Sequence, residues 1–247
     1  MTIRVEHVSQ GFGAQEVLRD VSLTVPTGRT VVLLGPSGVG KSVLLKIVAG
    51  LLEPDEGDVW IDEVSIFNAS ERSVAALRRD LGLVFQSSAL FDSLTVGENI
   101  LFGLQDGVGQ TLTPALRAQV EERLAWVNLG PDVIGKYPGE LSGGMQKRVA
   151  IARAIAGGQR CVLYDEPTSG LDPLNSDTVG QLIRQLQHEL GVTSLVVTHD
   201  LELTAAVADT VALLDRGRIQ AEVPASRLGS LEHPLVQARR SRLEFVA

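Results

Sequence analysis

The segment Gly35-Pro-Ser-Gly-Val-Gly-Lys41-Ser42 carries the residue types that hold a nucleoside triphosphate. Its glycines leave backbone N–H groups free to converge on phosphate oxygens, because no Cβ obstructs them. Lys41 is expected to reach the β- and γ-phosphates, and the Ser42 hydroxyl is expected to ligate Mg²⁺. Every fixed position of G-x-x-x-x-G-K-[ST] is matched, which predicts a P-loop with the binding residues Gly35, Pro36, Ser37, Gly38, Val39, Gly40, Lys41, Ser42 and Val43.

Two acidic residues stand at the end of another apolar run, Cys161–Asp165. A carboxylate at the carboxyl end of a parallel strand points into the crevice where ligands bind. We therefore expect Asp165 to hold Mg²⁺ and Glu166 to activate the attacking water as a general base. Two solvated acids after a strand are the alternative, and the P-loop upstream favours the catalytic interpretation.

Two further features carry polar groups that could meet a nucleotide. His199 follows the apolar run Ser194–Thr198, at the place where a contact to the γ-phosphate is expected, although a lone histidine is usually structural. Ser142 and Gly144, within Leu141-Ser-Gly-Gly-Met-Gln146, open a predicted helix whose free N–H groups and hydroxyl form a ready anion site. On the residues alone, a plain N-cap explains Ser142 equally well.

The elements that must position these residues follow from hydrophobic periodicity. Thr30–Gly35, Cys161–Asp165 and Ser194–Thr198 are apolar without alternation, as in strands covered on both faces. Helices are predicted after two of them, over Lys41–Leu52 and from the N-cap Asp172 to Leu190. Strand, helix and strand in this order predict an α/β fold with a parallel core sheet.

The remaining segments predict additions to that core. An N-terminal antiparallel β layer is expected from Ile3–Val8, Val17–Val25 and Asp58–Ile66, and a short strand from Gly82–Phe85. Residues 88–156 are mostly helical, with helices expected over Thr113–Leu129 and Ser142–Ala156, and strand character is lost after Ile219. We predict a single domain, 1–247: an α/β core (1–87 and 157–223), a helical subdomain (88–156) and a C-terminal helical tail (224–247).

Composition excludes several classes of protein. Of the 247 residues, 22 are Lys or Arg and 30 are Asp or Glu, giving a net charge of −8. This acidity argues against nonspecific nucleic-acid binding and against adhesion to an anionic membrane surface. The single cysteine, Cys161, is expected in the core, and no apolar run approaches the length that spans a bilayer.

Together, the P-loop, the acidic pair and the LSGGMQ segment resemble the ATP-binding cassette (ABC) ATPases, over Val8 to about Pro224. The resemblance implies the P-loop NTPase fold of ABC ATPases, with ATP and Mg²⁺ as cofactors. It implies that Ser142, Gly143 and Gly144 contact the γ-phosphate held by Lys41 of a second copy, and hence a head-to-tail homodimer.

The same resemblance assigns four more residues. Gln86 matches the Q-loop glutamine, whose amide oxygen ligates Mg²⁺ beside a segment that touches a membrane partner. His199 matches the switch histidine that links the γ-phosphate to Glu166, and Asp172 matches the D-loop aspartate at the dimer interface. Phe12 is either a satellite core residue or the aromatic ring that stacks on adenine, a contact worth roughly 1 kcal/mol.

A narrower resemblance concerns the cargo. Residues 85–99 (FQSSALFDSLTVGEN), 141–148 (LSGGMQKR) and 164–173 (YDEPTSGLDP) are similar to the ATPase subunits of MCE-associated, Mla-type lipid transporters. This implies phospholipid transport with an integral-membrane permease and an MCE-domain lipid-binding protein, at the cytoplasmic face of the inner membrane.

Two alternatives stay open from the sequence. The chain could serve an importer of polar amino acids or another small solute, because every site residue would be the same. A non-transport ABC ATPase acting on nucleic acid or ribosomes is disfavoured, since the chain has one P-loop, no long coiled-coil insertion and an acidic net charge.

Overall fold

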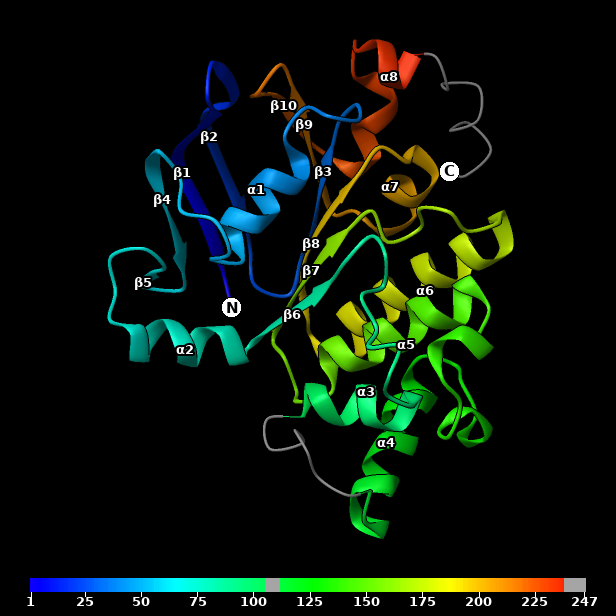
Figure 1. The fold of residues 1–247 in the computed structure, drawn as a ribbon. Helices are drawn as coiled ribbons and strands as arrows, with labels where there is room; N and C mark the ends of the chain where they lie inside the picture. Colours follow the sequence, from blue (N-terminus) through cyan, green and yellow to red (C-terminus); the bar gives the residue numbers. More distant parts are fainter. Residues whose placement is uncertain (105–111, 238–247) are drawn as a thin grey trace.

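The computed structural model describes residues 1–104 and 112–237, which form two β-sheets and the helices around them (Figure 1). The larger sheet has six strands in the order β10-β9-β3-β8-β7-β6, and the smaller has four in the order β2-β1-β4-β5. The larger sheet consists of β3 Thr30–Leu34, β6 Leu81–Val84, β7 Cys161–Asp165, β8 Thr193–Thr198, β9 Thr210–Asp215 and β10 Arg218–Pro224. Five of these strands are parallel, and only the edge strand β10 is antiparallel.

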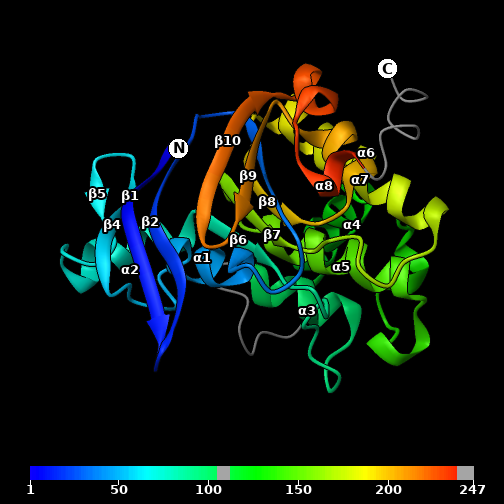
Figure 2. The same cartoon turned by 90° about the horizontal axis from the view of Figure 1, so that it is seen from above.

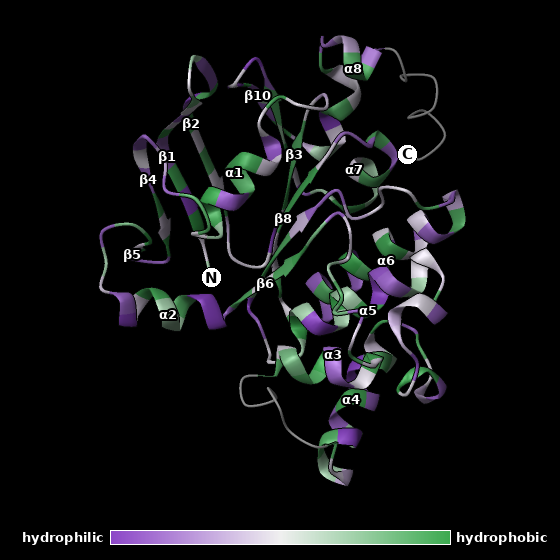
Figure 3. Ribbon diagram, viewed as in Figure 1, coloured by the Kyte–Doolittle hydropathy of each residue, from purple (hydrophilic) through white to green (hydrophobic). Residues whose placement is uncertain are grey.

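The central strands carry apolar runs because both faces of the larger sheet are covered. All residues of β3, β7 and β8 are buried, and Figure 3 shows β3 in the hydrophobic colour. Alternate side chains enter different cores, since neighbours along a strand point to opposite faces. Val32 and Leu34 pack with α5 (Gly143–Ile155) and α6 (Pro173–Leu190), whereas Val31 and Leu33 pack with α1 (Lys41–Val48) and the smaller sheet.

The smaller sheet confirms the predicted antiparallel layer, with one correction. The prediction of one strand over Asp58–Ile66 was wrong, because the chain turns at Asp62 and pairs Ile61 with Val64. Asp62 adopts φ 50°, a left-handed conformation that aspartate tolerates better than most residues. The strands are β1 Ile3–Phe12, β2 Gln15–Val25, β4 Glu56–Ile61 and β5 Val64–Ser65.

The helices cover both faces of the larger sheet (Figure 2). The first is shorter than predicted: α1 ends at Val48 and not at Leu52, because the N–H of Leu51 turns back to the carbonyl of Lys46. Similarly, α4 ends at Trp126 and not at Leu129. The helices are α1 Lys41–Val48, α2 Glu71–Arg79, α3 Val96–Gly103, α4 Pro114–Trp126, α5 Gly143–Ile155, α6 Pro173–Leu190, α7 Leu201–Val207 and α8 Pro234–Gln237.

The C-terminal part contains a second correction. Strand character does not end at Ile219, since β10 continues to Pro224. Its residues alternate between exposed and half-buried, so the strand lacks the apolar run that marks the central ones, and its pairing with β9 defines it. A 3-10 helix, Ala225–Ser230, and α8 follow, and residues 238–247 lie outside the described part.

The boundaries of the predicted lobes stay a prediction. Short 3-10 helices, Pro131–Val133 and Pro138–Glu140, link α4 to α5. Within residues 1–104 and 112–237, none of the helices combines the length and the apolar character needed to cross a bilayer.

Candidate functional site

A cavity of about 430 Å³ opens where β3, β6, β7 and β8 end at the same edge of the larger sheet. Its lining comes from the end of β1, the start of β2, the P-loop and the residues that follow β6, β7 and β8. The structure therefore brings together most of the residues singled out from the sequence. The lining residues are Phe12, Val17, Ser37, Gly38, Gly40, Lys41, Ser42, Val43, Gln86, Glu166 and His199.

The P-loop joins β3 to α1 and folds around the side chain of Lys41. The ammonium group of Lys41 donates to the carbonyl oxygens of Gly35 and Pro36, each at 2.9 Å, and lies 3.4 Å from Oε1 of Glu166. Gly40 caps α1 with φ 107°, a conformation closed to other residues, and a Cβ there would lie 2.8 Å from Leu18. The N-terminal end of α1 thus faces the cavity with free N–H groups, as an anion site requires.

Ser42 and Asp165 form the candidate magnesium site. The hydroxyl of Ser42 donates to Oδ1 of Asp165 at 2.8 Å, which joins the first turn of α1 to the end of β7. A hydroxyl and a carboxylate are oxygen ligands of the kind that Mg²⁺ takes in phosphate sites, where it keeps several waters. These residues fit the ion, which would neutralise charge on the phosphates.

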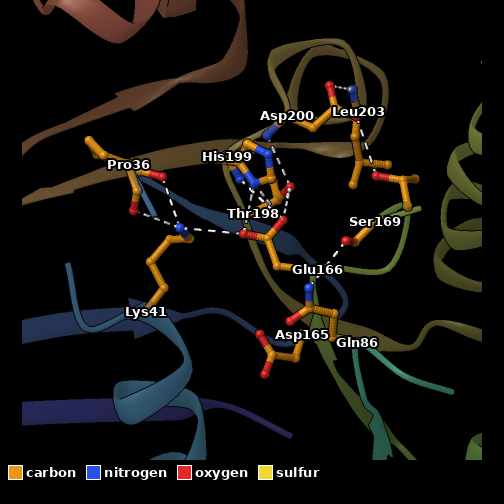
Figure 4. A network of polar contacts seen from close by, with 12 residues as sticks. Pro36, Lys41, Gln86, Asp165, Glu166, Ser169, Thr198, His199, Asp200 and Leu203 are labelled. Atoms are coloured by element: carbon orange, nitrogen blue, oxygen red, sulfur yellow. Dashed lines mark hydrogen bonds and ion pairs between the residues drawn. The ribbon is translucent and has the colours of Figure 1, made fainter. Parts of the chain in front are cut away.

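Glu166 is the most constrained residue of the site. Oε2 accepts the hydroxyl of Thr198 at 3.0 Å, and both carboxylate oxygens lie 3.0 Å from Nδ1 of His199 (Figure 4). The backbone of Glu166 adopts φ 45°, a left-handed conformation that is costly for a glutamate. Such strain persists only where the surroundings impose it, and it is concentrated at functional sites.

Gln86 and Phe12 complete the lining. The amide of Gln86 donates to the hydroxyl of Ser169 at 3.2 Å and lies near Asp165 in Figure 4. Phe12 is 51% exposed and belongs to neither hydrophobic core, so the alternative of a satellite core residue was wrong. Its ring is free to stack on a nucleotide base.

The structure leaves the LSGGMQ segment (residues 141–146, the signature segment) and Asp172 outside this cavity. Ser142 is the N-cap of α5, accepting the N–H of Met145, and Asp172 is the N-cap of α6, accepting the N–H of Asn175. Hydrogen bonds from the side chain and backbone of Asn175 hold the pKa of Asp172 below its usual value. The two caps are neighbours, because Gly144 packs so closely on Asn175 that a Cβ would overlap its side chain.

Lys147 is a residue of this region that the sequence analysis missed. It lies on α5, is 3% exposed and donates to the carbonyl oxygens of Phe85 and Gln86. Burial lowers its pKa to about 8, opposed by the charge of Asp165. One signal could have identified Lys147. It is a lysine among the buried positions Gly144, Val149 and Ala150 of α5.

Comparison with known proteins decides the family. The family model described as ABC transporter matches residues 18–169, which include the P-loop, the signature segment and Glu166. The chain belongs to the ABC transporter family. The prediction of an ABC ATPase with ATP and Mg²⁺ as cofactors is thereby confirmed at the level of the family.

Several transport proteins are similar in sequence to this ABC cassette. It is 38% identical to the probable ribonucleotide transport ATP-binding protein mkl of Mycobacterium tuberculosis, over 96% of this chain and 66% of the relative. It is 40% identical to the Fe(3+) ions import ATP-binding protein FbpC of Escherichia coli, over 88% of this chain and 60% of that protein. The chain thus spans less than two thirds of the length of these curated relatives.

Solved structures support the fold. The dimeric structure of the bacterial ABC transporter cassette MJ0796 aligns with a TM-score of 0.81 and 33% identity, covering 90% of this chain and 98% of that one. A dimeric post-hydrolysis state of MJ0796 with ADP and Pi aligns with a TM-score of 0.80 and 32% identity over the same shares. The predicted P-loop ABC ATPase fold is confirmed, whereas the roles of single residues stay predictions.

Proposed function

We propose that this chain hydrolyses Mg·ATP to drive an ABC transporter for lipid. The observation that carries the ATPase part is the convergence of Lys41, Ser42, Glu166 and His199 on one cavity. These residues supply an ammonium group for the phosphates, a hydroxyl for the ion, a carboxylate for the water and an imidazole beside it. This set matches what phosphoryl transfer to water needs.

The reaction follows from where each group lies. Lys41 exchanges its contacts to loop carbonyls and Glu166 for the β- and γ-phosphates. Glu166, freed from Lys41 and held by Thr198 and His199, accepts the proton of the attacking water. Ser42, Asp165 and Gln86 would hold Mg²⁺, which would neutralise charge on the phosphates.

The site needs a second copy of the chain to be complete. Ser142, Gly143, Gly144 and Asp172 do not line the cavity of their own chain. In a head-to-tail dimer, the exposed N-terminus of α5 meets the γ-phosphate held by the other protomer. Two ATP molecules then lie between the protomers, and their phosphates favour closure only while the triphosphate is present. The dimeric structures of MJ0796 support this arrangement.

The transport partners are also part of the proposal. A permease would receive the movement of the dimer, with the cassette held at the cytoplasmic face of the inner membrane. Phospholipid cargo and an MCE-domain protein rest on the resemblance of residues 85–99 and 141–148 to Mla-type ATPases. No nucleic acid is expected as a partner.

A small-solute importer is the second candidate, because the relatives FbpC and a 40% identical sulfate/thiosulfate import protein CysA of Gloeobacter violaceus carry such names. The two candidates separate on purification of the native complex from membranes, with mass spectrometry of proteins and lipids. An MCE-domain protein with phospholipid supports the proposal. A solute-binding protein without phospholipid would contradict it and favour the importer.

A further inference from the structure

The loop that follows β6 is attached to α5 by two positively charged side chains. The first is Lys147, whose ammonium group donates to the carbonyl oxygens of Phe85, at 3.1 Å, and of Gln86. The carbonyl of Phe85 also accepts the N–H of Ser88 at 3.0 Å, so Lys147 reinforces the turn that begins the loop.

The second is Arg153, two turns further along α5. Its guanidinium group donates to the carbonyl oxygens of Ser88, at 3.1 Å, and of Ala89, at 2.8 Å. It also lies 5.6 Å from the centre of the Phe91 ring, a cation–π contact. Four of the five carbonyls in residues 85–89 are therefore held by cations of one helix.

The loop needs this support because its backbone is strained. Ser88 and Ala89 have φ values of 64° and 47°, two successive left-handed residues without a glycine. Such a conformation persists only when its surroundings impose it. The hydrogen bonds from Arg153 fall on these two residues.

Burying the charges of Lys147 and Arg153 costs free energy, which indicates that these side chains do more than fill space. Among the salt bridges within residues 1–104 and 112–237, none includes Lys147 or Arg153, and the charge of Asp165 acts on Lys147 only from beyond ion-pair distance. A buried ammonium group without a carboxylate is expensive, and an apolar side chain would fill the position more cheaply. What the two cations provide is a directional connection to one loop.

We propose that Lys147 and Arg153 are positioning residues that fasten the loop 85–89 to α5. This proposal rests on the proposed function, in which Gln86 ligates the Mg²⁺ of its own chain's nucleotide and Ser142 contacts the partner's nucleotide. Because Ser142 caps the helix that carries both cations, the contact made by Gln86 and the contact made by Ser142 shift together. A change at the Mg²⁺ site is thus transmitted to the signature end of α5 through backbone carbonyls.

The test compares Lys147→Met, Lys147→Arg and the control Lys136→Met, which removes a lysine of the surface pair with Asp132. Hydrogen exchange of peptides covering residues 85–94 is measured first, in the nucleotide-free full chain. We expect at least about tenfold faster exchange in Lys147→Met, because the variant loses both charge-assisted hydrogen bonds of Lys147. Lys147→Arg and Lys136→Met should exchange like the wild type.

The second readout is the Mg²⁺ dependence of ATP hydrolysis. Lys147→Met should raise the half-activating Mg²⁺ concentration about tenfold, as expected for residues that orient a metal ligand, and Lys147→Arg should restore it. ATP affinity in EDTA should stay at the wild-type value, because the P-loop is intact.

Three outcomes overturn the proposal: unchanged exchange of residues 85–94 in Lys147→Met, a uniform rise across all helices, or an unchanged Mg²⁺ requirement. The first two outcomes are measured without nucleotide, so they test the attachment of the loop 85–89 to α5 independently of ATP hydrolysis. A wild-type chain that hydrolyses no ATP would instead refute the proposed function.

Discussion

Nδ1 of His199 lies 3.0 Å from both carboxylate oxygens of Glu166, and the backbone N–H of His199 points to Oε2 at 3.4 Å. Thr198, the last residue of β8, donates its hydroxyl to the same oxygen. The proposed base therefore directly follows β7 but is oriented by the end of β8. A shift between these two neighbouring strands would move Glu166 relative to the phosphates.

This relationship predicts the effect of His199→Ala. Without the imidazole, the carboxylate of Glu166 loses its orientation, and we expect kcat for ATP hydrolysis to fall about a hundredfold. Steady-state kinetics with Mg·ATP check this, with His188→Ala in the last turn of α6 as the control. A rise in KM with kcat unchanged would show that His199 only binds substrate.

Phe12 provides a separate test of base recognition. Phe12→Ala should weaken ATP binding by roughly 1 kcal/mol, since it removes one aromatic stacking contact, while Phe12→Trp should preserve binding. Calorimetry with ATP and with inorganic triphosphate separates the contribution of the base to the binding free energy from that of the phosphates. Equal losses for both ligands would contradict stacking, because inorganic triphosphate has no base.

Cys161 reports on the core of the larger sheet. Burial raises the pKa of its thiol to about 12, so the reactive thiolate is scarcer in the folded protein than in the unfolded one at every lower pH. We predict that iodoacetamide at pH 8 leaves the native protein unlabelled and adds one group after denaturation in guanidinium. Rapid labelling of the native chain, seen by mass spectrometry, would contradict the buried position.

The parts predicted from sequence are those with a local signal. Val31–Leu34 and Cys161–Leu163 form unbroken apolar runs because they are buried on both faces, and the P-loop matches its motif residue by residue. The N-caps Ser142 and Asp172 were found for the same reason, since a cap acts on N–H groups of its own helix.

The parts not predicted depend on contacts distant in the sequence. The division of Asp58–Ile66 into two strands follows from the left-handed turn at Asp62, which also accepts the N–H of Thr2. Strand β10 is defined by its pairing with β9, not by its own polar residues. Likewise, the hydrogen bond of Lys147 to the carbonyl of Phe85 forms only when α5 lies against the loop after β6.

The central claim is that two chains complete each ATP site, and the oligomeric state of Glu166→Gln tests it most directly. This variant retains the shape of the carboxylate but lacks the base, so it should bind ATP without hydrolysing it. Light scattering after size-exclusion chromatography should show a dimer with Mg·ATP and a monomer with Mg·ADP. Adding Ser142→Arg should return the ATP-bound protein to a monomer. A wild-type monomer that turns over ATP at the full rate, or an ATP-bound dimer indifferent to Ser142→Arg, would contradict the account.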